Sequence, residues 1–152
     1  MISHVPSVAV PPGLGFKPGV VALCIRRGNL FVLVPRSWVR GMRELTPGAV
    51  TPLPRTKRWV LGLLEEGARP LPLLDPAGCV AATAPAPLAA VLLAAPEREP
   101  FALIGADGPG RFVSIPDGAY LEEETGWISR VQGGMKATWW LETGRLASEL
   151  AG

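Results

Sequence analysis

Glycine and proline interrupt this chain at short intervals, and this spacing restricts the folds that it can adopt. The sequence has 152 residues, of which 18 are glycine and 17 are proline. Most of them lie between apolar runs of about four to eight residues, which is the length of a β-strand. Because a proline inside a helix costs about 3 kcal/mol, a bundle of long helices is excluded. We therefore expect short strands that are joined by turns.

The hydrophobic content of the chain excludes disorder, although glycine and proline are frequent. Hydrophobic residues make up 48% of the sequence, charged residues 18%, and the net charge is +2. A disordered chain needs low hydrophobicity and high net charge. The length predicts one domain that is large enough to bury a core. Residues 1–18 contain four prolines, so we expect a loose arm there and a folded domain over 19–152.

The expected strands are apolar runs that end at Pro, Gly, Asn or Asp. They cover residues 19–27, 30–35, 37–45, 59–64, 69–75, 87–95, 96–106 and 110–116. Residues 27–29 and the Glu65-Glu66-Gly67 segment are expected to form tight turns. Near the C-terminus, Thr143 is a candidate cap for a short helix that places Leu146 and Leu150 on one face. Many short strands at this spacing predict a barrel or a sandwich, an all-β fold.

The cysteines and one uncharged segment bear on the cellular compartment. Cys24 and Cys79 are far apart and form no CxxC motif, which is typical of a reduced, cytoplasmic protein, although the sequence leaves open whether they pair. Residues 79–96 carry no charge. Pro85 and Pro87 interrupt this segment and no basic residue anchors it, so we expect a buried strand at 88–95 and no membrane span.

The charge is divided unevenly along the chain. Residues 1–75 carry ten Lys/Arg and four Asp/Glu, whereas residues 76–152 carry five and nine. Such asymmetry allows a second hypothesis, a nucleic-acid-binding barrel. Its candidate contacts are Arg36, Arg40, Arg43, Arg55 and Arg58. The basic half lacks the interleaved aromatic residues that stack on bases, so this hypothesis is the weaker one.

The residues that catalysis requires are largely missing. The only histidine, His4, lies in the expected arm, so no nucleophile has a histidine base. No spacing of His, Cys, Asp or Glu is typical of a metal site, and no glycine run has the phosphate-loop pattern. We interpret Glu65-Glu66 and residues 122–124 as solvated turn residues. The sequence thus predicts no catalysis, cofactor or metal, and a ligand site in a cleft between two halves is the third hypothesis.

One motif of 22 residues, PRTKRWVLGLLEEGARPLPLLD, is the most specific feature of the sequence. Its key positions are Pro54, Trp59, Gly62, Pro72 and Asp75. Gly62 inside a bulky strand predicts the close approach of another backbone. Pro72 inside a strand predicts an edge position or a bulge, because it cannot donate to the ladder. Asp75 before Pro76 can accept hydrogen bonds from turn amides.

This motif resembles the signature of CheW-like domains, the coupling modules of bacterial chemosensory arrays. The resemblance is close over these 22 residues and extends as a looser pattern over residues 19–150. It implies two small SH3-like, five-stranded β-barrels that share one core, with a short C-terminal helix. It also implies a non-catalytic adaptor in chemotaxis, type IV pilus motility or another output. The implied partners are the signalling tip of a chemoreceptor and a CheA-type histidine kinase.

The chain departs from the family at the turn of the motif. Where the family has N-L-R-G, this chain has Glu65, Glu66, Gly67 and Ala68, so glycine replaces the arginine that is implicated in partner contact. Two acids repel a surface that would attract arginine, so we expect altered partner choice. The expected contact residues are Val39, Arg40, Glu65, Glu66 and Arg69. An open strand edge beside this motif would also allow self-association.

Overall fold

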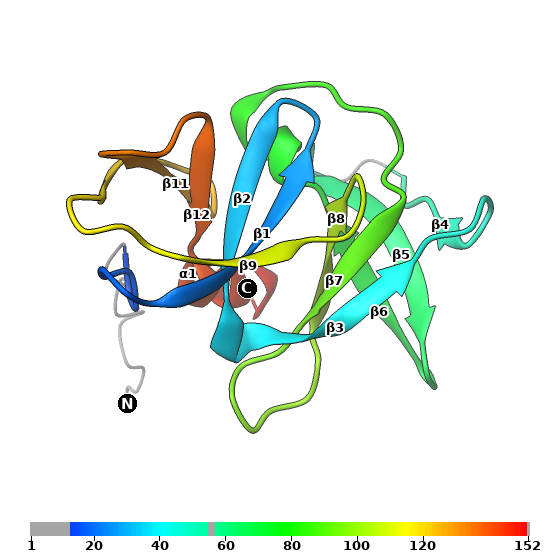
Figure 1. Cartoon of the computed structure of the whole chain (residues 1–152). Coiled ribbons are helices and arrows are strands. Elements are labelled where there is room, and N and C mark those ends of the chain that lie inside the picture. The colour runs from blue at the N-terminus through cyan, green and yellow to red at the C-terminus, as the bar shows by residue number, and fades with distance from the viewer. Residues whose placement is uncertain (1–12, 55–56, 152) are drawn as a thin grey trace, which may run out of the picture.

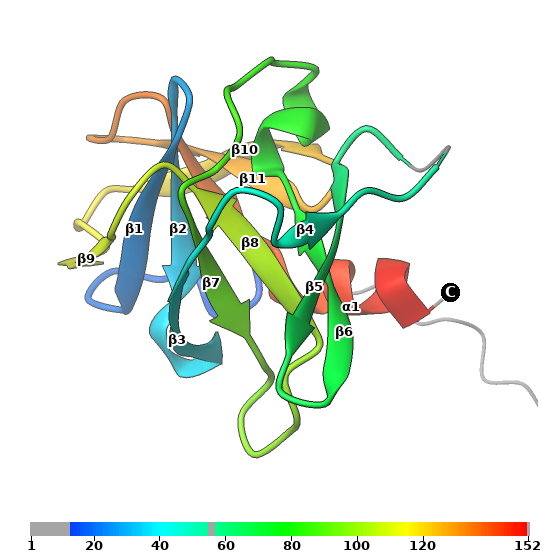
Figure 2. The same cartoon turned by 90° about the vertical axis from the view of Figure 1, so that its right-hand side faces the viewer.

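The chain forms two curved β-sheets and a short C-terminal helix (Figure 1). The structure is a computed structural model, which describes residues 13–54 and 57–151. Sheet A has the strand order β10-β11-β12-β2-β1-β9, and sheet B has the order β3-β7-β8-β6-β5-β4. Each sheet thus has six strands where five were expected. In Figure 2, β1 and β2 of sheet A stand to the left, β5 and β6 of sheet B to the right, and β7 and β8 between them.

The chain passes from sheet A to sheet B and then returns to sheet A. The strands of sheet A are β1 (Val21–Arg27), β2 (Leu30–Pro35), β9 (Arg111–Ser114), β10 (Tyr120–Thr125), β11 (Ile128–Gln132) and β12 (Thr138–Leu141). Those of sheet B are β3 (Val39–Glu44), β4 (Val50–Thr51), β5 (Val60–Glu66), β6 (Arg69–Leu74), β7 (Ala89–Leu93) and β8 (Ala102–Ala106). The helical elements are η1 (Arg36–Trp38), η2 (Pro76–Val80) and α1 (Thr143–Ala151).

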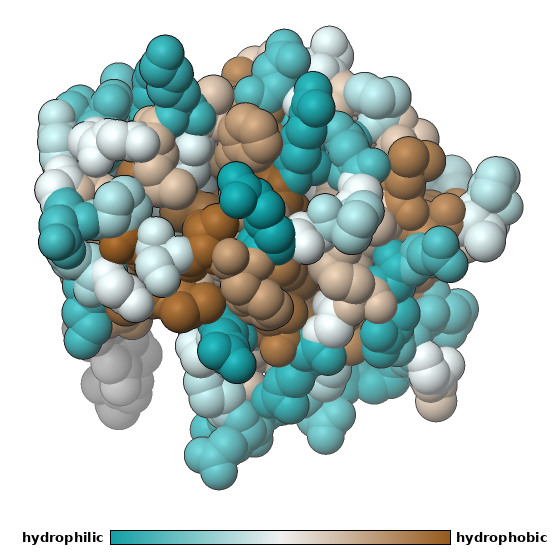
Figure 3. Space-filling model, in the orientation of Figure 1, coloured by the Kyte–Doolittle hydropathy of each residue, from teal (hydrophilic) through white to brown (hydrophobic). Residues whose placement is uncertain are grey.

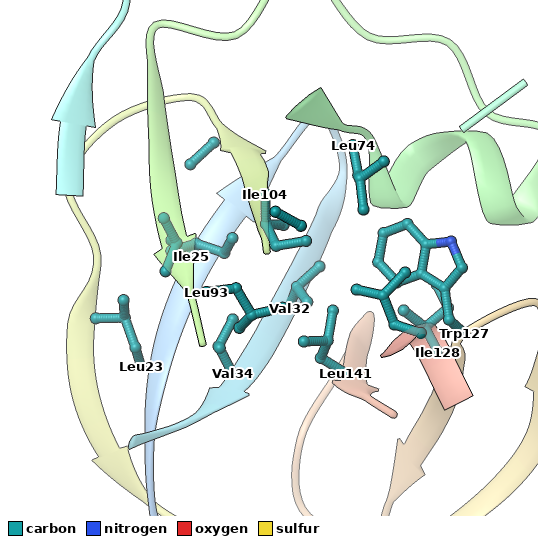
Figure 4. Packing of buried hydrophobic residues seen from close by; sticks show 14 of the residues in the cluster. Leu23, Ile25, Val32, Val34, Leu74, Leu93, Ile104, Trp127, Ile128 and Leu141 are labelled. Carbon is teal, nitrogen blue, oxygen red and sulfur yellow. The ribbon is translucent and has the colours of Figure 1, made fainter. Parts of the chain in front are cut away.

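Three hydrophobic clusters explain why two small sheets form one folded unit. One cluster lies inside sheet A, a second inside sheet B, and the largest contains residues of both sheets (Figure 4). Leu73 of β6 faces the cluster of sheet B, whereas its neighbour Leu74 faces the shared cluster. Because successive side chains of a strand point to opposite faces, one strand contributes to two cores. This arrangement requires long apolar runs instead of strict alternation.

The strands of the predicted hairpin at 19–35 and of the motif are present close to their expected positions. The segment expected at 37–45 begins with the single 3-10 turn of η1, and the strand follows. Residues 88–95 contain β7, which is buried throughout, as predicted. No helix among the described residues is long and apolar enough to cross a membrane. Cys24 and Cys79 are free thiols, and burial raises the pKa of Cys79 to about 12.

Two acidic segments that were expected to be turns lie in strands, and this expectation was wrong. Residues 122–124 belong to β10, an edge strand that pairs only with β11. Glu123 has a φ of 48° at a bulge in this strand. Glu65 and Glu66 are the last residues of β5, and the turn is Gly67-Ala68. At a sheet edge most side chains of a strand face water, so a polar run gives the same sequence signal as a turn.

The first and last described segments, residues 13–18 and α1, both pack against the rest of the fold. Leu146 of α1 is fully buried and Leu150 packs against the shared cluster, in agreement with the predicted helix face. Residues 1–12 of the expected arm lie outside the described residues, and so does His4. Residues 13–18, which were expected to be loose, lie against sheet A. The ring of Phe16 contacts that of Trp140 edge to face at 5.2 Å because this aromatic surface would otherwise face water.

Candidate protein-interaction surface

A pair of hydrogen bonds joins the end of β3 to the end of the β5–β6 hairpin. Arg43 Nε donates to Glu66 Oε1 at 2.8 Å, and Arg43 Nη2 donates to Glu66 Oε2 at 3.1 Å. In the order of sheet B, β3 is the first strand and β5 the fifth. A contact between them therefore requires the sheet to curl into a barrel. The Arg43 side chain is 40% exposed, so this pair lies at the protein surface.

The hairpin surface consists of Arg43, Glu65, Glu66 and Arg69. Glu66 lies directly opposite Arg69 in the β5–β6 register, while Arg43 holds its carboxylate from the other side. Glu65 and Arg69 are exposed and form no ion pair with any described residue. This part of sheet B therefore presents alternating charges to water, which is suited to recognition of a charged protein surface.

The other two expected contact residues lie at the start of β3 and have different surroundings. Val39 is half-buried and packs against the shared cluster. Arg40 Nη2 donates to the carbonyl oxygens of Ala95 and Arg98, both at 3.0 Å. Arg40 thus holds the loop between β7 and β8. The structure brings Glu65, Glu66 and Arg69 together on one hairpin and leaves Val39 and Arg40 near the opposite end of β3.

Gly62 of the motif lies where β4 crosses close to β5. A Cβ atom at this position would lie 2.3 Å from the Thr51 carbonyl oxygen and 2.9 Å from Val50 Cγ1. The backbone φ of Gly62 is 153°, and a bulge separates it from Val60 in the β5–β6 ladder. A larger residue would force β4 away from β5. This close approach is the physical reason for a glycine in an otherwise bulky strand.

The prolines of β6 lie where this strand has a neighbour on one side only. In sheet order β6 is an interior strand, but its ladder with β8 begins at Leu73. Pro70 and Pro72 therefore pair only with β5, opposite Glu65 and Leu63. Proline has no backbone N–H group, and at these two positions β6 has no neighbouring strand on the β8 side to which such a group would donate. The first part of β6 is locally an edge, where proline is tolerated.

Pro54 and Trp59 flank the start of β5. Pro54 is exposed in the turn after β4. Trp59 is half-buried, and its ring meets that of Trp127 edge to face at 5.8 Å. Trp127 precedes β11, so this contact joins the two sheets. These two residues shape the entry to the hairpin and do not belong to the hairpin surface.

A buried charge cluster centred on Arg27 was not predicted. Arg27 Nε and Nη2 donate to the two carboxylate oxygens of Asp75 at 2.9 and 3.0 Å, and Nη1 donates to Asp107 at 2.9 Å. Asp75 also accepts from the Ala77 amide at 3.0 Å, the type of turn bond that the Asp-Pro pair predicts. Arg27 is 1% exposed. Although burial would lower its pKa, the hydrogen bonds and charges of both aspartates raise it.

This cluster fastens the two sheets together and is not a docking surface. Arg27 ends β1 of sheet A, whereas Asp75 and Asp107 follow β6 and β8 of sheet B. The two partners lie 48 and 80 residues from Arg27 in the sequence. No local pattern indicates such pairing, and the Arg26-Arg27 pair has the sequence signal of a solvated strand end.

A second buried carboxylate, Glu142, holds the segment that precedes β1. Its two oxygens accept from the Gly13 amide at 2.8 and 2.9 Å, and one of them also accepts from the Ser129 hydroxyl. Burial raises the pKa of Glu142, although the hydrogen bonds from Ser129 and Gly13 lower it. Glu142 was not predicted either, because in sequence it is an ordinary acid before a helix.

The fold removes the charge asymmetry that supported nucleic-acid binding. The segments that build sheet A, 13–38 and 107–152, together carry eight Lys/Arg and seven Asp/Glu, whereas residues 39–106 carry seven and six. Each part therefore has a net charge of +1. Among the candidate contacts, Arg40 and Arg43 are engaged within the protein, and Arg55 lies outside the described residues. Arg36 and Arg58 are exposed.

The third hypothesis places a ligand site in a cleft between the two sheets. The space between them contains the shared cluster, which includes Leu74, Ile104 and Trp127, each fully buried. Within residues 13–54 and 57–151, no three His, Cys, Asp or Glu side chains are grouped as metal ligands would be. The described surface thus offers chemistry for protein recognition, at the hairpin surface above all.

Comparison with known proteins identifies the fold. No protein-family model matches the chain, and no curated protein has a significantly similar sequence. Among solved structures, the crystal structure of the scaffolding protein TtCheW from Thermoanaerobacter tengcongensis superposes with a TM-score of 0.59. The match covers 82% of this chain and 88% of that protein, at 9% sequence identity. The chain therefore has a CheW-like fold, with two SH3-like barrels, as the motif predicted.

Proposed function

We propose that this protein is a non-catalytic adaptor of a bacterial chemosensory or motility system, in which it couples a receptor to a histidine kinase through protein contacts. The observation that carries this proposal is the CheW-like fold, which extends over 82% of the chain and has a scaffolding protein as its structural match. A fold alone does not specify a function. The hairpin surface adds a candidate contact site at the place where the family motif departs from its usual sequence.

The chemistry of the hairpin surface indicates the kind of partner. Glu65 is exposed and free of ion pairs with described residues, whereas Arg43 binds the carboxylate of Glu66. CheW-like domains are expected to present arginine here, whereas this chain presents carboxylates. A partner that pairs with the free carboxylate of Glu65 must carry lysine or arginine opposite it. We therefore propose a receptor or kinase whose contact face is basic.

The proposal is tested with two purified fragments, the signalling tip of a chemoreceptor and the regulatory domain of a CheA-type kinase from the same cell. Isothermal titration calorimetry should detect binding of at least one fragment to the wild-type protein. Glu65→Lys should weaken that binding about tenfold or more, because it places like charges at the contact. Asp117→Lys, the same change in an exposed turn of sheet A, is the matched control and should leave binding unchanged.

The results that oppose the proposal are equally specific. If neither fragment binds at tens of micromolar, which is within the ordinary range of weak signalling contacts, coupling is not the function. If a fragment binds but Glu65→Lys and Asp117→Lys weaken it equally, the hairpin surface is not the contact site. Circular dichroism of both variants ensures that a loss of binding does not reflect a loss of fold.

A further inference from the structure

The strand β9 forms one edge of sheet A and leaves one side of its backbone without a partner. Arg111–Ser114 pairs with β1 in an antiparallel ladder, and β9 is the last strand in the sheet order. In such a ladder alternate N–H and C=O groups point away from the neighbour. Among the residues that the structure describes, no hydrogen bond reaches this outer row. The row is a template for a further strand.

One side chain of β9 is large, apolar and exposed. Phe112 is 56% exposed, although it is one of the largest apolar side chains of the molecule. The Arg36 guanidinium lies over its ring at 5.6 Å. Figure 3 shows apolar side chains gathered near the middle of the face over β9, next to strongly hydrophilic ones. An exposed aromatic ring beside an unpaired edge favours strand addition over solvation.

The charges around β9 indicate the character of the added strand. Arg36 and Arg111 are exposed, and neither forms an ion pair with a described residue. Lys17 is exposed in the segment that precedes β1. Asp117, in the turn after β9, is the acid closest to the strand in sequence. Two free guanidinium groups beside an apolar ring are complementary to a segment with both carboxylates and apolar side chains.

A groove continues from the Phe112 side of the strand. It encloses about 720 Å³, and its apolar lining comes from Leu14, Val20, Val21, Pro35 and Trp38. Arg36 lines the same groove and also covers Phe112, and Val21 pairs with Ser114 of β9. The groove therefore lies next to β9 and reaches it through Arg36 and Val21. An apolar side chain of an added strand can enter the groove while its neighbours, which point to the opposite face, pair with Arg111.

We propose that β9 and this groove bind an extended, acidic segment of a partner protein by strand addition. Apolar side chains at alternate positions of that segment pack on Phe112 and enter the groove beside Arg36, and its carboxylates pair with Arg111 on the opposite face. Pro109 and Pro116 flank β9, so the new ladder is limited to the four residues between Arg111 and Ser114. A short ladder predicts weak, reversible binding.

This site goes beyond the coupling function proposed above, because it lies on sheet A and the hairpin surface lies on sheet B. An adaptor must hold two partners together, and two surfaces on different barrels allow both to bind at once. The hairpin surface favours a basic partner, whereas the β9 edge favours an acidic one. The two sites therefore select for opposite charge.

The experiment uses the full chain and a short capped peptide in which glutamate and valine alternate, labelled for fluorescence anisotropy. The wild-type protein should bind it, and Phe112→Ala should weaken binding about tenfold or more. Arg111→Glu should weaken it further, with a marked dependence on salt. The matched control is Tyr120→Ala, which removes an exposed aromatic ring from β10, the other edge of sheet A, and should leave binding unchanged.

Two modified peptides keep the test independent of variant folding. Alternate N-methylation removes the backbone donors that a ladder needs, and a valine–lysine peptide reverses the charge; both should fail to bind wild-type protein. The proposal is overturned if either modified peptide binds as tightly as the parent peptide. It is also overturned if the parent peptide does not bind. Sedimentation tests whether a second copy of the chain occupies the edge. If the wild-type protein is a dimer and Phe112→Ala is a monomer, the edge binds a second copy and the proposal is overturned. Glu65→Lys should not affect peptide binding, so the failure of one site is distinguishable from that of the other.

Discussion

Two arginine–carboxylate pairs in this protein have nearly the same geometry and opposite surroundings. Arg27 binds both oxygens of Asp75 at 2.9 and 3.0 Å, and Arg43 binds both oxygens of Glu66 at 2.8 and 3.1 Å. The Arg27 side chain is 1% exposed, whereas that of Arg43 is 40% exposed. The first pair joins the two sheets, and the second lies on one sheet at the surface. Burial, and not geometry, separates their roles.

This difference follows from the cost of removing charges from water. A buried pair gains little net energy from its formation, because desolvation offsets the attraction, but the loss of one partner leaves an uncompensated buried charge. An exposed pair is screened, and each partner regains water when the other is removed. Removal of Arg27 should therefore destabilise the protein more than removal of Arg43.

Arg27→Ala should have the largest effect on stability. It leaves Asp75 and Asp107 without their cation between the two sheets, and the expected loss is about 3–5 kcal/mol of the free energy of unfolding. The measurement is urea denaturation followed by tryptophan fluorescence. Arg26→Ala is the matched control, because the neighbouring side chain is exposed and donates only to the Gly28 carbonyl oxygen. Equal losses for the two variants would contradict a special role of the buried cluster.

Glu142 sharpens the comparison because its carboxylate is buried without an arginine hydrogen bond. Its pKa is raised in the folded state above the ordinary value of 4.5. The folded protein therefore binds the proton more tightly than the unfolded chain, and this contribution to stability is lost as pH rises from 4.5 through the raised pKa. As pH rises over this range, the free energy of unfolding of the wild type should fall relative to that of Glu142→Gln.

The control for Glu142 is a carboxylate that faces water. Glu122→Gln removes an exposed acid from β10 and is measured over the same pH range. The groups that face Glu142 are Ser129 and the Gly13 amide, with the charges of Glu124 and Arg145 nearby. If the free energy of unfolding of the wild type instead rises with pH relative to that of Glu142→Gln, these donors outweigh burial and the pKa of Glu142 is lowered.

The sequence was sufficient to predict the core of this fold because the signals for it are local. The hairpin of β1 and β2, the motif strands β5 and β6 and the glycine at position 62 all depend on residues that are close in sequence. The fold class followed from apolar runs and their breakers. Leu73 and Leu74, which face different cores, also explain why those runs lack strict alternation.

The charged contacts were beyond prediction because they join residues that are remote in sequence. Arg27 meets Asp75 and Asp107 only after two sheets have formed, and Arg43 meets Glu66 only after sheet B has curled. The uneven charge of the two sequence halves gave a misleading indication of nucleic-acid binding for the same reason. In the fold, β1 and β2 of the basic half join the strands of the acidic C-terminal half. The five expected contact residues were predicted as one group, and the structure places only Glu65, Glu66 and Arg69, which are neighbours in sequence, on one hairpin.

Arg43→Ala should have the smallest effect on stability and a distinct effect on binding. Because the pair with Glu66 is exposed, we expect a loss of about 0–1 kcal/mol in the free energy of unfolding. The substitution frees the Glu66 carboxylate and removes a positive charge from the hairpin surface, so a partner with a basic face should bind more tightly. Glu66→Ala has the opposite effect on charge and should bind that partner more weakly. Calorimetric titration of both variants against the same fragment therefore separates recognition from stability, and weaker binding of Arg43→Ala would instead make Arg43 itself a contact to an acidic partner.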